Sequence, residues 1–177
     1  MLLAAALVAC SSGEPPGPDV PALIADLGSA DAQVSGRANL DLIAAGEPAV
    51  VPLAALLADT NRDVTLRRKA ASALWGLGRT AAAAVPALAA ALTDADTQLK
   101  ASAAMALENM GPAAEAAVPQ LVKALDDPAG DVRQWAAKAL GAIGPAARTA
   151  IPALKEAARR PAIRSAAEAA IRRIQGR

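Results

Sequence analysis

The sequence predicts an all-α fold, an α-solenoid built from five repeats of two helices each. Three observations predict it: an alanine-rich composition with few aromatic side chains, a Val-Pro or Ile-Pro pair that recurs about every 33 residues, and a glycine series with the same period. A single helix pair cannot bury its apolar faces alone, so neighbouring repeats must stack to form a continuous core. At 8–10 Å per helix layer, we expect a rod about 50 Å long.

The composition narrows the classes of function. The chain of 177 residues is 54% hydrophobic, but small alanines carry that fraction, which favours closely packed helices. It has no histidine, which is the commonest metal ligand and general base, and a single cysteine, which excludes an internal disulfide and a Cys/His zinc cluster. The net charge of +1 provides no overall field for steering nucleic acid. We therefore expect no catalysis, no metal, no cofactor and no nucleic-acid partner.

The first nine residues form an apolar run that is followed by Cys10, in the sequence MLLAAALVAC. The run is too short to span a bilayer as a helix, which needs about 20 apolar residues. Leu7-Val8-Ala9-Cys10 resembles the lipobox of bacterial lipoproteins, in which the peptide is cut before a cysteine that becomes lipidated. The resemblance implies a signal peptide over residues 1–9, a lipidated Cys10 with a flexible tether over 10–19, and a repeat domain over 20–177.

The same segment departs from a signal peptide in one respect, because no Lys or Arg precedes the apolar run. The alternative is an incidental thiol at Cys10 in a cytoplasmic protein. If the lipoprotein interpretation holds, Ser11 stands where an aspartate would favour retention at the inner membrane. The family resemblance then favours the outer membrane of a bacterial envelope.

The repeats follow from two independent landmarks. Successive prolines are separated by 31, 34, 33 and 33 residues, and successive glycines by 32, 33 and 33. The landmarks are Pro21, Pro52, Pro86, Pro119 and Pro152, and Gly46, Gly78, Gly111 and Gly144. After each proline comes an apolar pattern with helical spacing, then a polar turn, then a second helical stretch that ends at the glycine.

The proline leaves two possibilities for the first helix of each repeat. If the helix begins near Val118, Pro119 lies in its first turn, where the missing N–H costs little. If it begins near Ala113, Pro119 must kink it. The helix-forming sequence GPAAEAA before it favours the kink.

The second helix of each repeat carries one apolar stripe with offsets of four, four and three residues. Its equivalent positions are Val34, Leu66, Leu99, Val132 and Ile163; Ala38, Ala70, Ala103, Ala136 and Ala167; Leu42, Leu74, Leu107, Leu140 and Ile171; and Ala45, Leu77, Met110, Ile143 and Ile174. The alanine column lets successive second helices approach closely. The glycine at the end of each stripe is expected to close the helix in a left-handed conformation.

The unit AVPQLVKALDDPAGDVRQWAAKALGAIG, residues 117–144, resembles a HEAT-like repeat of the short type associated with phycobilisome lyase subunits. The resemblance covers about residues 20–175 and implies a right-handed superhelix. Long HEAT units also pair an aspartate with a basic residue six positions later, in a ladder along the stack. Asp94/Lys100 and Asp127/Arg133 match this spacing, Asn61/Arg67 matches in part, and Ser29/Ser35 and Ala158/Arg164 depart from it. The ladder should therefore weaken towards both ends.

The basic column Arg67, Lys100, Arg133 and Arg164 has two interpretations. The favoured one is structural, with each side chain a ladder partner near a helix start. The other is a groove for an acidic partner, which requires these side chains to point freely into solvent.

Second-helix positions opposite the apolar stripe are the candidate binding residues, because nothing in the fold dictates them. Trp75 at one of these positions and Trp135 at a flanking position are the expected anchors, since Trp and Arg are enriched at binding hot spots. The alternative for each tryptophan is packing within the stack. The residues expected around them are Arg68, Met105, Glu108 and Lys138.

These observations favour a non-catalytic scaffold that binds a protein or peptide and is lipid-anchored in the bacterial envelope. The HEAT resemblance also includes the iron enzyme deoxyhypusine hydroxylase, whose His-Glu ligands are absent here. One alternative is an accessory subunit of a cofactor- or chromophore-handling enzyme. Another is a structural envelope spacer with no specific partner.

Overall fold

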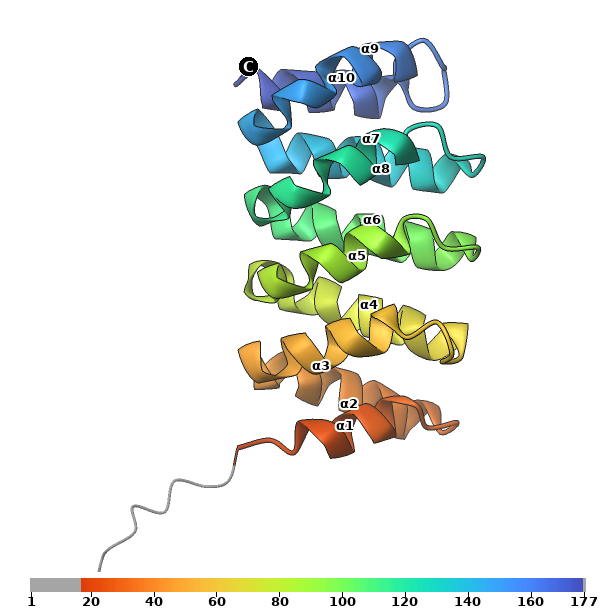
Figure 1. Cartoon of the computed structure of the whole chain (residues 1–177), viewed down its shortest axis with the longest axis vertical. Helices are drawn as coiled ribbons and strands as arrows, with labels where there is room; N and C mark the ends of the chain where they lie inside the picture. The colour runs from red at the N-terminus through yellow and green to blue at the C-terminus, as the bar shows by residue number, and fades with distance from the viewer. Residues whose placement is uncertain (1–16, 177) are drawn as a thin grey trace, which may run out of the picture.

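The structure is a computed structural model that describes residues 17–176. Cys10 and the apolar run before it lie outside the described residues. Figure 1 shows the described chain as a stack of helix pairs, with one pair per layer from the N-terminal repeat to the C-terminal repeat. The fold is an all-α solenoid, as the two periodic landmarks predict.

Ten α-helices and three 3-10 helices make up the described chain. The first helices of the five repeats are α1 (Val20–Leu27), α3 (Glu47–Ala58), α5 (Val85–Ala91), α7 (Val118–Ala124) and α9 (Ile151–Ala157). The second helices are α2 (Ala32–Ala45), α4 (Val64–Leu77), α6 (Thr97–Met110), α8 (Gly130–Ile143) and α10 (Arg164–Ile174). The 3-10 helices are η1 (Gly78–Ala84), η2 (Gly111–Ala117) and η3 (Gly144–Ala150).

The prediction that Pro119 kinks a longer first helix is wrong. The segment before it is helical, but it is the 3-10 helix η2, and a new α-helix begins at Val118 with Pro119 in its first turn. The missing N–H therefore lies among donors that have no partner within the helix anyway. Among the described residues, only Pro52 lies inside an α-helix beyond its first turn, because α3 begins at Glu47 and runs through it.

The predicted apolar stripe forms the core. Its alanine column is buried in all five repeats, and Leu42, Leu74, Leu107 and Leu140 are fully buried beside it. At the N-terminal end Val34 is exposed, because no earlier repeat covers it. Burial is thus most complete where a repeat has a neighbour on both sides, as stacking requires.

The glycines after the second helices have positive φ, as predicted, but they are not in the left-handed helical conformation. Gly111 has φ 59° and ψ −131°, and the equivalent glycines have ψ between −129° and −141°. These angles fall in the mirror-β region, which glycine populates because it has no Cβ. This conformation makes glycine more strictly required than a left-handed helical one would, because no other residue populates this region at low cost.

One glycine inside a helix sets the distance between the last two layers. A Cβ built on Gly141 of α8 would lie 2.9 Å from the Cα of Ala170 in α10. Backbone-to-backbone approach of this kind is possible only when small residues face each other. None of the described helices is long and apolar enough to cross a membrane.

Candidate functional site

The second helices present one row of positions on the side opposite the apolar stripe. We call it the second-helix face and define it by the positions equivalent to Arg68, Ser72 and Trp75. It comprises Gly36, Leu40 and Ile43 in α2; Arg68, Ser72 and Trp75 in α4; Ala101, Met105 and Glu108 in α6; Gln134, Lys138 and Gly141 in α8; and Ser165, Ala169 and Arg172 in α10. Two hollows lie along this face.

The smaller hollow lies between α4 and α6 and encloses about 200 Å³. Trp75 and Met105 line it together with Ser72 and Ser102. Trp75 is 46% exposed, so its indole is available on the surface rather than consumed by packing within the stack. Two predicted binding residues from different repeats therefore meet in one hollow.

The larger hollow lies between α6, α8 and α10 and encloses about 450 Å³. Glu108, Trp135 and Lys138, all predicted binding residues, line it, and Arg173 joins them from α10. The Nζ atom of Lys138 lies 4.0 Å from the centroid of the Trp135 ring, in cation–π geometry. Trp135 is half-buried and packs against the core, so it has both a packing role and an open side.

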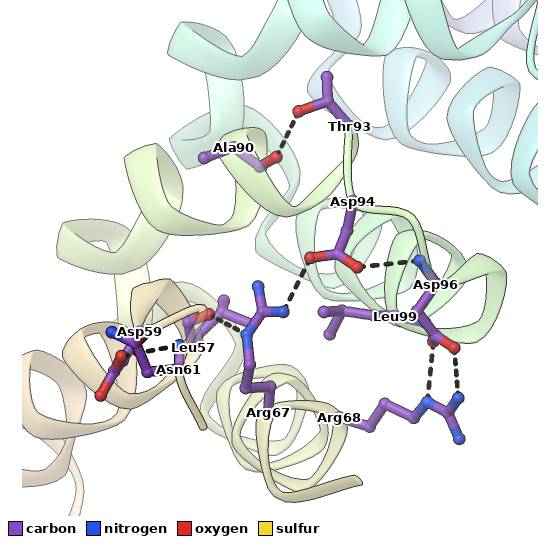
Figure 2. Close-up of polar contacts among 10 residues, drawn as sticks. All are labelled: Leu57, Asp59, Asn61, Arg67, Arg68, Ala90, Thr93, Asp94, Asp96 and Leu99. Carbon is purple, nitrogen blue, oxygen red and sulfur yellow. Dashed lines mark hydrogen bonds and ion pairs between the residues drawn. The ribbon is translucent and has the colours of Figure 1, made fainter. Parts of the chain in front are cut away.

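Arg68 lies outside both hollows. Figure 2 shows its guanidinium against the carboxylate of Asp96, with Nε donating to Oδ1 at 2.8 Å and Nη2 bonded to Oδ2. Hydrogen bonding from Arg68, opposed by partial burial, holds the pKa of Asp96 below its usual value, and Asp96 raises the pKa of Arg68. Asp96 also caps α6 by accepting from the N–H of Leu99 at 2.7 Å. Arg68 thus joins α4 to the start of α6.

The basic column forms a ladder between repeats. Arg67 is buried, its Nη1 lies 2.8 Å from Asp94 of the next repeat, and its Nε donates to the carbonyl of Leu57 at 2.9 Å (Figure 2). Lys100 repeats the pairing one layer on, with Nζ 2.5 Å from Asp127. Burial opposes ionisation of Asp94, but the N–H of Asp96 and the guanidinium of Arg67 outweigh it and lower its pKa.

The ladder weakens towards both ends, as predicted. In the repeat after Arg133 the position equivalent to Asp127 is Arg160, and Arg133 donates instead to the carbonyls of Asp127 and Pro128 at 2.7 Å. Arg164 donates to the carbonyl of Ala158, and Ser35 donates to that of Leu27. All four basic side chains of the column are engaged within the stack, which supports their structural role over an acidic-partner groove.

Sequence reasoning missed Leu40, which is 62% exposed on α2. It occupies the position equivalent to Ser72, Met105 and Lys138, so the repeat alignment could have identified it. It extends the apolar part of the second-helix face into the first repeat.

The described residues contain no group of three or more His, Cys, Asp or Glu side chains placed to hold a metal ion. The acidic side chains in the turns instead cap helices or form ladder pairs. Asp31 and Asp63, for example, accept from the first N–H groups of α2 and α4.

Comparison with known proteins agrees with this architecture. A family model described as HEAT repeats matches residues 85–172. The complex of CpcE and CpcF of phycocyanin lyase from Nostoc sp. PCC7120 contains a chain 28% identical, with a TM-score of 0.71; the match covers 98% of this chain and 71% of that one.

Two engineered structures are also similar. One engineered protein is 25% identical with a TM-score of 0.66, over 89% of this chain and 79% of its own. A designed armadillo repeat protein in complex with the peptide (KR)4 is 20% identical with a TM-score of 0.65, over 86% of this chain and 80% of its own, and this likeness concerns the fold alone. No curated protein sequence matches the chain.

Proposed function

We propose that this chain, whose residues 85–172 match a family model described as HEAT repeats, is a non-catalytic module that binds a protein or peptide on its second-helix face. Solenoids of this kind present extended surfaces made from equivalent positions of successive repeats. The proposal depends above all on Trp75, an indole that is 46% exposed beside a hollow while the stack has buried alanines and leucines available for its core. Large exposed aromatic side chains of this kind anchor partners in many interfaces.

Site-specific photocrosslinking tests the proposal. We would place p-benzoylphenylalanine at Trp75 or Met105 and irradiate the protein in extracts of the native cell. Val51 provides the matched control, because it is 68% exposed and apolar but lies on the first helix α3. We expect one discrete crosslinked partner from positions 75 and 105 and none from position 51. Equal crosslinking from all three positions, or none from any, would contradict the proposal, and the second outcome would favour a structural spacer.

We further propose that the module is held at the bacterial envelope, with the outer membrane favoured, by a lipid on Cys10. The support is the lipobox-like sequence Leu7-Val8-Ala9-Cys10 and the Pro/Gly/Ser-rich stretch that follows it. We expect radiolabelled palmitate to enter the wild-type protein and to be absent after Cys10→Ala. Label that persists in the variant would refute lipidation at this residue.

A second candidate function is an accessory subunit of a chromophore- or cofactor-handling enzyme. The similarity to a chain of the phycocyanin lyase complex over 98% of this chain favours it. Purification from the native cell separates the candidates. A visible absorption band that co-purifies with the protein would favour the accessory subunit, whereas a colourless complex with a crosslinked partner at Trp75 would favour the binding module.

A further inference from the structure

Charge is distributed unevenly along the solenoid, although the net charge is only +1. Residues 17–63 carry seven acidic and two basic side chains, whereas residues 148–176 carry seven basic and two acidic ones. The N-terminal end of the stack is therefore negative and the C-terminal end positive. Such an asymmetry creates a potential that orients a charged partner along the rod.

The second-helix face follows the same direction. Towards the N-terminal end the large exposed side chains of this face, Leu40 and Trp75, are apolar, and Met105 is half-buried. Towards the C-terminal end, Lys138 and Arg173 line the larger hollow. Among the described residues neither of these cations lies within ion-pair distance of a carboxylate, in contrast to the ladder residues Arg67 and Lys100.

The larger hollow has the features of a carboxylate site. Trp135 holds the Lys138 ammonium over its ring by cation–π attraction, which limits the positions that the lysine samples without neutralising its charge. A guanidinium such as that of Arg173 can bind a carboxylate through two parallel hydrogen bonds. Glu108 also lines the hollow and opposes an incoming carboxylate, so the two cations exceed the acid by one charge.

We propose, on the basis of the proposed function, that the bound segment is a peptide with acidic side chains at one end and apolar side chains at the other. Its acidic end lies over α8 and α10, against Lys138 and Arg173, and its apolar end lies over α2 to α6, against Leu40, Trp75 and Met105. Four layer spacings of 8–10 Å separate α2 from α10, or about 35 Å. An extended peptide covers this distance with about 11 residues.

A polyanion such as nucleic acid fits the face less well. It would place phosphates along the whole face, including its apolar half and the acidic N-terminal end. Competition by a single-stranded oligonucleotide measures whether nucleic acid binds this face nevertheless.

Selection from a displayed library of random peptides about 12 residues long tests the proposal, with the full chain as bait. We expect the selected peptides to be enriched in Asp and Glu at one end and in apolar residues at the other. Enrichment of neutral or basic peptides would overturn this inference and leave the proposed function standing. If no peptide is enriched and Trp75 yields no crosslinked partner, both fail.

Charge variants then locate the contact, with fluorescence anisotropy of a selected peptide as the readout. We expect Lys138→Gln and Arg173→Gln each to weaken binding about two- to fivefold, which is the range for an exposed ion pair. Glu108→Gln should tighten binding about twofold, because it removes the opposing carboxylate. The matched control is Lys155→Gln, which also removes one positive charge and lies in the same repeat as Arg173, but on the first helix α9.

A change for Lys155→Gln as large as that for Lys138→Gln would overturn the proposal, because binding would then follow overall charge rather than the hollow. Displacement of the peptide by a single-stranded oligonucleotide at equal concentration would likewise overturn it in favour of a general polyanion site.

Discussion

Replacing Gly141 with alanine tests whether the last two layers are packed as closely as the structure indicates. In an open helical position, Gly→Ala stabilises a helix by about 1 kcal/mol. At Gly141 the added Cβ would lie 2.9 Å from the Cα of Ala170, well inside the optimal carbon–carbon separation of about 3.5–4.0 Å. The atom that it meets belongs to the backbone, so α10 must move as a unit to relieve the clash.

Gly36 provides the matched control. It also lies inside a second helix, α2, but a Cβ built there meets no atom within 4 Å. Gly36→Ala should therefore raise the free energy of unfolding by about 0.5–1 kcal/mol. For Gly141→Ala, an overpacking cost of about 1–3 kcal/mol exceeds the gain in helix propensity. We expect a net loss of up to about 2 kcal/mol, opposite in sign to the control.

Urea unfolding followed by circular dichroism measures both variants, because a change in the midpoint at constant slope reports a change in stability. Shortening the facing side chain with Ala170→Gly should recover only part of the loss, since the nearest clash is with the Cα itself. If Gly141→Ala proves as stabilising as Gly36→Ala, then α8 and α10 do not approach as described and the reasoning is wrong.

The remaining predictions concern the prolines, the ladder and the helix ends, and urea midpoints measure each. Pro52→Ala should stabilise the protein by about 1–2 kcal/mol because it restores a backbone donor inside α3. Pro119→Ala, in the first turn of α7, should change stability by less than about 0.5 kcal/mol. Equal effects of the two variants would contradict these placements of the prolines. Arg67→Met should cost about 2–3 kcal/mol because it leaves the partly buried Asp94 carboxylate without its cation, and adding Asp94→Asn should recover much of this loss. The pKa of Asp94 is lowered in the folded state, so the stability that its ionised carboxylate contributes is complete above the ordinary pKa of 3.8 and is lost as the pH falls through the folded pKa. Arg67→Met should flatten this acid dependence of stability. An unchanged pH profile would refute the pairing. Gly111→Ala should cost about 2 kcal/mol from its positive φ alone, since the new Cβ meets only an ordinary contact at 3.5 Å.

The repeat architecture could be predicted because it depends on periodicity within the chain. The proline and glycine series, the alanine column and the leucines beside it all lie where the spacing placed them. Such features follow from local helix geometry, in which residues three and four apart share a face. The same alignment identified the second-helix face, and five of the six proposed partner-binding residues line the two hollows along it.

Features that depend on contact between layers could not be predicted in the same way. The Asp94/Lys100 spacing suggested a ladder, but its rungs join Arg67 to Asp94 and Lys100 to Asp127, each across a repeat boundary. Arg68 looked as free as its neighbours on the face, yet Asp96 of the next repeat holds it. Both pairings require knowing how one layer is rotated on the next, which spacing along one helix does not specify.

The sequence by itself therefore determined the number of repeats, the buried side of each second helix and the need for glycine at its end. The tertiary structure decided that the helical segment before Val118 is a 3-10 helix, that Trp75 is exposed while Trp135 also packs against the core, and that Lys138 lies over the Trp135 ring. The physical reason is the range of the interactions. The spacing of apolar residues within one helix determines which of its sides is buried. Which side chains meet across two layers depends instead on how one layer packs on the next.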